Sequence, residues 1–88
     1  MKITGEYILR EIVGETLLIP VGETALSFNG MITLDPVGAL IWKDLEQDSA
    51  RETILAHILE EFEVPADVAS QDLDEFLTQM EQAGLLQM

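Results

Sequence analysis

The sequence predicts an α+β fold of winged helix-turn-helix-like arrangement, in which a small antiparallel sheet of three or four strands precedes three helices. Two observations support this prediction. Before Pro36 the apolar residues fall in short runs separated by turn-forming residues, whereas after Pro36 they follow the helical period to the end of the chain. Because the chain has 88 residues, 48% of them hydrophobic, we expect a single domain over residues 1–88 with a small core.

The expected strands are four β-rich runs, at residues 7–12, 15–21, 24–28 and 31–34. Val13-Gly14 should form a tight turn between the first two. Asn29-Gly30 is the clearest hairpin signal, because both residues accept the positive φ of a type I′ turn. The run from Met31 to Leu34 is therefore expected to be the last strand, lying where the sheet meets the helices.

The first helix should begin at Asp35 and Pro36, which suit the N-cap and the first helical position. Its apolar stripe extends to about Leu45. Trp42 lies beside that stripe, and its indole N–H would need a hydrogen-bond partner if the ring is buried.

Two further helices follow from capping signals. Ser49 and Glu52 have the spacing of a capping box, which predicts a second helix ending near Phe62. A third helix should run from near Pro65 to about residue 83, with Gly84 as the glycine that follows the helix.

The charge of the chain limits its partners. Seventeen acidic and four basic residues give a net charge of −13, and twelve of the acids, but only Arg51 among the bases, follow residue 43. Such a charge repels phosphate backbones, so we expect no nucleic acid partner. The acids either solvate exposed helix faces or attract a basic segment of a partner. Without a long apolar run, a signal peptide or any cysteine, the expected location is the cytoplasm, with no membrane association.

Catalytic chemistry is not expected. His57 with Glu60 and Glu61 could place metal ligands on one helical turn, but a surface histidine between acids is the simpler interpretation. The serines have no adjacent base, and the scattered glycines form no phosphate-binding loop. We therefore expect no enzyme activity, no metal and no cofactor, which leaves a binding function.

The segment from Met31 to Leu34 is the best candidate for that function. It carries no charge and no proline, which are the features that normally protect an edge strand from further pairing. An exposed edge beside an apolar helix face can accept a peptide as an added strand. The alternative is that this strand is central or covered.

Several segments together resemble the PqqD-like family, the pyrroloquinoline-quinone synthesis protein D relatives that are also called RiPP recognition elements. The resemblance extends from Tyr7 to Leu86, and the order and spacing of the segments are more specific than any one of them. Leu34-Asp35 departs from the family's common leucine-asparagine step but keeps the ability to cap a helix. The segments are Tyr7–Ile12, Leu17–Pro20, Phe28–Leu34, Gly38–Trp42, Phe62–Val64, Asp72-Leu73, Phe76-Leu77 and Gly84–Leu86.

The resemblance implies a three-stranded winged helix-turn-helix domain that binds the leader of a ribosomally made precursor peptide. The leader would add to the third strand, lie against the third helix, and be presented to a maturation enzyme such as a radical-SAM protein. Phe76 and Leu77 could each belong to the groove or to the core. The implied peptide-binding residues are Met31, Ile32, Thr33, Leu34, Val68, Asp72, Leu73 and Phe76.

Two other functions remain open from the sequence. One is a winged-helix regulatory domain that binds another protein. The other is a small acidic homodimer with a structural role, formed by pairing of the uncharged edges. Dimerisation through this edge is also compatible with peptide binding.

Overall fold

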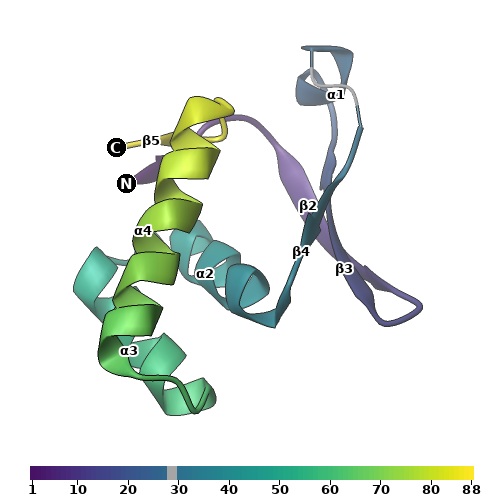
Figure 1. Ribbon diagram of the computed structural model, residues 1–88. Coiled ribbons are helices and arrows are strands. Elements are labelled where there is room, and N and C mark those ends of the chain that lie inside the picture. Colours follow the sequence, from purple (N-terminus) through teal and green to yellow (C-terminus); the bar gives the residue numbers. More distant parts are fainter. Residues whose placement is uncertain (28–29) are drawn as a thin grey trace.

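The computed structural model describes residues 1–27 and 30–88, and Figure 1 shows a three-stranded sheet standing beside a group of three longer helices. The sheet contains β2 (Tyr7–Ile12), β3 (Glu15–Pro20) and β4 (Ile32–Leu34). The helices are α2 (Pro36–Glu46), α3 (Arg51–Glu61) and α4 (Ala66–Gln82). The predicted α+β class, with an antiparallel sheet followed by three helices, is confirmed.

The sheet has the order β2-β3-β4, so β4 lies at one edge. β2 and β3 form a hairpin whose turn places Val13 and Gly14 at positive φ, 50° and 80°. β4 pairs antiparallel with β3, with Leu18 opposite Ile32 and Thr16 opposite Leu34. Since side chains alternate across a sheet, Leu18 and Leu34, which are both buried, face the helices together.

The segment before β4 differs from the prediction. Residues 24–28 were expected to form a strand, but Thr24–Ser27 is a short helix, α1. Thr24 Oγ1 accepts a hydrogen bond from the Glu6 N–H at 2.8 Å, and Gly22 C=O accepts one from the Ala25 N–H at 3.2 Å. These local bonds satisfy the backbone without a strand partner. The Asn29-Gly30 turn includes Asn29, which lies outside the described residues.

The ends of the chain form a second sheet that the sequence did not predict. β1 (Lys2–Ile3) pairs antiparallel with β5 (Leu86–Gln87). Each strand has two residues, too few to show an alternating pattern. The prediction that Met31 to Leu34 would be the last strand is therefore wrong for the chain as a whole, although β4 is the last strand of the larger sheet.

The signals at the start of α2 and the end of α4 are confirmed. Asp35 Oδ1 accepts a hydrogen bond from the Gly38 N–H at 2.7 Å, and Pro36 is the first residue of α2. After α4, Gly84 has a φ of 86°. The N–H groups of Gly84 and Leu85 donate to the carbonyls of Glu81 and Met80, at 3.1 and 2.9 Å. This pair of bonds is a Schellman motif, and it turns Leu85 back onto the core.

The predicted capping box of α3 is wrong. Ala50 occupies the N-cap and offers no side-chain bond. The Ser49 N–H instead donates to the carbonyl of Asp44 at 3.2 Å, which makes Ser49 part of the turn after α2. Pro65 likewise precedes α4 as its N-cap instead of lying inside the first turn.

The core lies between the sheet and the helices and joins them through Trp42. The Trp42 side chain is 1% exposed, and its ring meets the Tyr7 ring edge-on at 5.7 Å. Among the described residues, the buried Trp42 Nε1 has no hydrogen-bond acceptor. No helix within residues 1–27 and 30–88 is long and apolar enough to cross a membrane. The buried core residues are Leu18, Leu34, Ile41, Trp42, Leu45, Ile54, Ile58, Ala69, Leu73, Leu77, Met80, Leu85 and Leu86.

Candidate functional site

The outer edge of β4 pairs with no other strand of the described chain. In a strand, successive backbone N–H and C=O groups point alternately to the two sides. β3 therefore takes up one set of β4 groups, and the other set points away from the sheet. This edge carries no charged side chain from Ile32 to Leu34, so nothing in the strand opposes the approach of a further strand.

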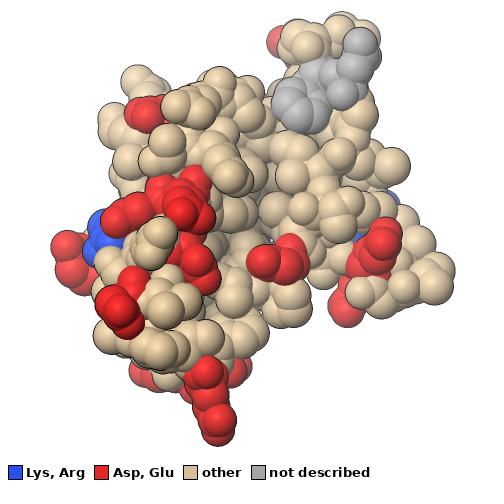
Figure 2. Space-filling view, in the orientation of Figure 1, with Lys and Arg blue, Asp and Glu red and all other residues tan. Residues whose placement is uncertain are grey.

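A groove lies beside this edge, between β4 and α4. It comprises two neighbouring hollows of about 180 and 230 Å³ that share Asp35, Gly38, Phe76 and Gln79. The smaller one borders β4, and the larger one extends between α2 and α4. Figure 2 shows the molecular surface hollowed between the helical part and the sheet. The remaining lining residues are Ile32, Thr33, Leu34, Val37, Ile41, Asp72, Glu75 and Met80.

Gly38 and Phe76 set the width of the groove. A Cβ atom at Gly38 would lie 3.2 Å from Phe76 Cε2 and 3.2 Å from Asp35 Oδ1, closer than most real Cβ contacts. The missing side chain therefore lets the Phe76 ring approach the first turn of α2. Phe76 is partly buried and packs against the core, so its ring both closes the core and offers a face to the groove.

The structure brings together five of the eight residues expected to bind peptide. Ile32, Thr33, Leu34, Asp72 and Phe76 line the groove. Leu34 is 6% exposed, so it contributes mainly its backbone at the edge.

The other three expected residues do not line it. Met31 precedes β4, and Val68 lies on α4 outside the lining; both are exposed, at 61% and 42%. The prediction that Leu73 lines the groove is corrected by its burial. Its side chain is 0% exposed, because it lies on the face of α4 that packs into the core.

Gln79 and Met80 line the groove but were missed by the sequence analysis. Gln79 follows Phe76 by three residues and Asp72 by seven, so all three share one helical face. That spacing is visible in the sequence and could have identified Gln79. The charged groups at the groove are Asp35, Asp72 and Glu75, and no lysine or arginine is among the described lining residues. The groove rim is therefore acidic.

Arg51 holds α3 against α4. Its Nε donates to Asp74 Oδ1 at 2.8 Å, and its Nη2 donates to Ser70 Oγ at 2.7 Å. The hydrogen bond from Arg51 lowers the pKa of Asp74 below its usual value. These bonds hold α4, the helix that carries Phe76, against α3.

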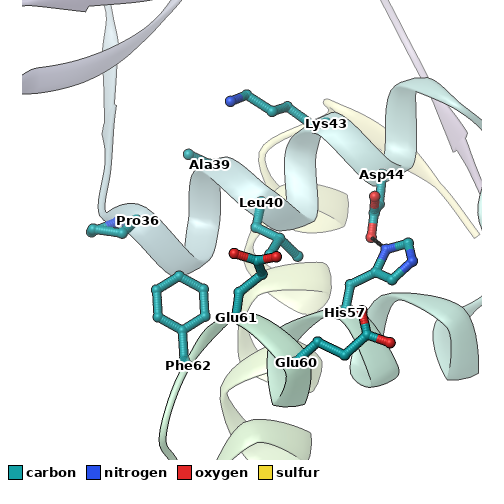
Figure 3. A pocket seen from close by; sticks show the side chains of 9 residues that line it. All are labelled: Pro36, Ala39, Leu40, Lys43, Asp44, His57, Glu60, Glu61 and Phe62. Carbon is teal, nitrogen blue, oxygen red and sulfur yellow. Dashed lines mark hydrogen bonds and ion pairs between the residues drawn. The ribbon is translucent and has the colours of Figure 1, made fainter.

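His57 is paired with an acid that the sequence analysis did not connect to it. Its Nδ1 donates to Asp44 Oδ2 at 2.6 Å, which joins α3 to α2 (Figure 3). This hydrogen bond, with the charges of Asp44, Glu60 and Glu61, raises the pKa of His57 above 6.5, although partial desolvation opposes the shift. Among the described residues no group of three potential metal ligands is found.

Replacing His57 by Gln is expected to destabilise the protein more at acidic than at alkaline pH. Because the folded-state pKa of His57 is raised, the charged pair stabilises the fold fully below about pH 6.5, and this contribution is lost as the pH rises through the folded-state pKa. Urea midpoints at pH 5.5 and 8.5 measure the effect, and an equal difference between wild type and H57Q at both pH values would contradict it.

Comparison with known proteins supports the description of the fold. No curated protein sequence matches the chain. The structure is similar to that of "TbiB1 in Complex with the TbiA(beta) Leader Peptide", with a TM-score of 0.76 and 29% identity over 99% of this chain and 95% of that one. It also shares its fold with "Lasso peptide synthetase B1 complexed with the leader peptide", with a TM-score of 0.73 and 17% identity over 96% of this chain and 93% of that one. The family described as Coenzyme PQQ synthesis protein D (PqqD) matches residues 15–86, and the chain belongs to this family.

Proposed function

We propose that this protein is a non-catalytic module that captures the leader of a ribosomally made precursor peptide by strand addition and presents it to a tailoring enzyme. The observation that carries the proposal is the free outer edge of β4 beside the groove that Phe76 lines. In this proposal residues 1–88 act as one domain in the cytoplasm, and the backbone of residues 31–34 binds the peptide.

The geometry of β4 determines which side chains of a guest strand would contact the protein. A guest added antiparallel at about 4.8 Å from β4 would place its residues opposite Ile32 and Leu34 on the helix side of the sheet. Those side chains would enter the groove between β4 and α4. The residue opposite Thr33, which is exposed, would face solvent. Affinity would come from the backbone and selectivity from alternate guest residues.

The chemistry of the groove favours an apolar guest side chain with polar or basic neighbours. Its floor contains Phe76 and Met80, and its rim contains Asp35, Asp72 and Glu75. Val68, exposed one turn before Asp72 on α4, would contact a longer peptide. Leu73 has no part in the proposed contact because it is buried.

The similarity to TbiB1 supports a peptide as the partner, because that protein is described in complex with a leader peptide. The maturation enzyme would be a separate protein, for which we propose a radical-SAM enzyme on the basis of the family resemblance. A homodimer formed through β4 would occupy the same edge, so peptide binding and such dimerisation would exclude each other.

Hydrogen exchange of β4 amides tests the proposal. With the TbiA(beta) leader peptide, or a short precursor encoded beside the gene of this chain, we expect slower exchange in residues 31–34 at saturation. The reason is that an added strand satisfies the outward N–H groups and excludes water from them. The amides of β2, at the opposite edge of the sheet, serve as the internal control. Binding that protects β2 and leaves residues 31–34 unchanged would overturn the edge-strand mechanism.

A further inference from the structure

A larger hollow of about 470 Å³ lies between α2 and the C-terminal half of α3 (Figure 3). It is separate from the groove but adjoins it. Asp35 lines the groove and Pro36 lines this hollow, so only the start of α2 lies between them. β4 ends at Leu34. A peptide that leaves β4 at this end therefore reaches the hollow next, which we call the α2–α3 pocket.

The α2–α3 pocket has an apolar end and an acidic end. Pro36 and Phe62 lie together at the end nearest β4. At the other end is the His57–Asp44 pair, with the Glu60 carboxylate beside His57. In Figure 3 the Glu61 carboxylate points toward Leu40, between Phe62 and the His57–Asp44 pair.

The basic side chains at the α2–α3 pocket do not neutralise it. The Lys43 ammonium extends from the far side of α2, away from Glu60 and Glu61 (Figure 3). His57 Nδ1 is bonded to Asp44, and the charges of Glu60 and Glu61 also act on His57 but form no ion pair with it. In the described part of the chain, neither Glu60 nor Glu61 has a hydrogen bond or an ion pair.

The position of these two acids disfavours folding. Both lie in the last turn of α3, where the helix dipole is negative, and a third acid, Glu63, lies two residues after Glu61. That turn has no basic residue. Sequences that break such a local rule tend to do so at functional sites. Acidic side chains also dominate the helical part of the face in Figure 2, with basic ones only at its margins.

We propose that the α2–α3 pocket is a second subsite for the same peptide, which takes an arginine or lysine flanked by an apolar residue. The inference rests on the proposed function and adds a requirement for the peptide sequence. The basic group would bind Glu60 and Glu61, and its apolar neighbour would pack on Phe62 and Pro36. Charge complementarity selects this occupant, because the pocket is acidic and the floor beside the acids is apolar.

A second copy of this chain is a poor occupant. It carries four basic residues, of which Arg51 is bonded to Asp74 and Lys43 lies at the pocket itself. Two copies would also bring together net charges of −13.

The spacing between strand and basic residue follows from the helix. Pro36 and Asp44 are eight residues apart on α2, which corresponds to about 12 Å along its axis. About four extended residues cover this distance. The N-terminal part of an antiparallel guest lies at the Leu34 end of β4. The basic residue should therefore precede the strand-paired segment by about four residues.

Selection of binders from a random library of 20-residue peptides tests whether the protein requires a basic residue at this spacing. Peptides selected by the wild-type protein should carry arginine or lysine about four residues before an apolar, strand-forming segment. The double variant E60Q/E61Q should lose this enrichment. The control E52Q/E81Q removes the same charge from exposed acids that do not line the pocket, and it should keep the enrichment.

Affinities of one selected peptide complete the test. We expect E60Q/E61Q to bind it about 3- to 10-fold more weakly, with a shallower salt dependence. A version of the peptide with glutamine in place of the basic residue should bind the wild type and E60Q/E61Q equally. The melting temperature of E60Q/E61Q should equal or exceed that of the wild type, since two anions leave the negative end of a helix.

The possible failures are distinct. Equal affinity of the wild type and E60Q/E61Q for the basic peptide would overturn the second subsite and leave the proposed function intact. Failure of the wild type to select any strand-forming peptide would overturn the proposed function itself.

Discussion

A proline at whichever of Ile32 and Thr33 has its N–H pointing outward is expected to weaken peptide binding about 10- to 100-fold while the fold persists. Adjacent residues of a strand direct their N–H groups to opposite sides, so one of these two groups faces β3 and the other faces the free edge. At the free edge, proline removes a donor for the guest strand and places its ring in the path of the guest. The net cost is that of one or two backbone hydrogen bonds.

The pair of variants makes this prediction stringent. I32P and T33P are compared with I32A and T33A, which change the same side chains but keep the N–H groups. One proline variant should lose binding and keep a melting temperature near that of its alanine control. The other should lose stability, because it breaks the ladder between β3 and β4. If both proline variants bind peptide as well as their alanine controls, strand addition at β4 is excluded.

Replacing Trp42 by Ala is expected to remove about 3 to 5 kcal/mol from the free energy of unfolding. The side chain is 1% exposed, and it packs against Tyr7 of β2 from its position on α2. The substitution would therefore open a cavity where the sheet meets the helices. Since small proteins have a total stability of about 5 to 15 kcal/mol, W42A should be close to unfolded under conditions that the wild type tolerates.

Comparing Trp42→Phe with Trp42→Ala separates the contribution of ring packing from that of the indole N–H. Phenylalanine is smaller, which costs stability, but it also removes the buried Nε1 donor that has no acceptor among the described residues. Leaving such a donor unpaired costs about 1 to 3 kcal/mol, so the two effects should nearly cancel. Urea unfolding should place W42F within about 1 kcal/mol of the wild type. A loss in W42F as large as that in W42A would show that the indole group makes a specific contribution.

Features encoded by adjacent residues were predictable from the sequence. Asp35 with Pro36 predicted the start of α2, and Gly84 predicted the end of α4, because capping requires particular residues at particular backbone conformations. The strand up to Leu34 was also predictable from its composition. These signals predicted the two elements that border the groove. One is β4, which ends where α2 begins, and the other is α4, whose apolar face carries Phe76.

Features that depend on distant residues were not predictable in this way. Thr24 has strand propensity, but its hydroxyl accepts a bond from Glu6, eighteen residues earlier, and the local chain is helical. His57 is thirteen residues from Asp44, its partner. Ser49 and Glu52 have capping-box spacing, but the Ser49 N–H donates to the Asp44 carbonyl, so Ser49 belongs to the turn after α2.

The residues of the candidate groove were likewise predictable only where adjacent residues determine them. The periodic pattern placed Phe76 and Leu77 on one apolar stripe of α4 but could not tell which of them belongs to the groove and which to the core. That distinction depends on the position of α2, whose Gly38 lies against the Phe76 ring. Leu77, which is 2% exposed, lies in the core, and Phe76 lies partly toward the groove, although both satisfy the helical period.

The pairing of β1 with β5 has a practical consequence for protein engineering. It holds Lys2 opposite Gln87, and the Thr4 N–H donates to the Leu85 carbonyl at 2.8 Å, so the two ends of the chain lie side by side (Figure 1). Neither end lines the groove at β4 or the α2–α3 pocket. The whole unit could thus be inserted into a surface loop of another protein through two short linkers that leave from one place. Circular permutants with new ends at the exposed Val13-Gly14 turn would need only a short bridge between the original termini.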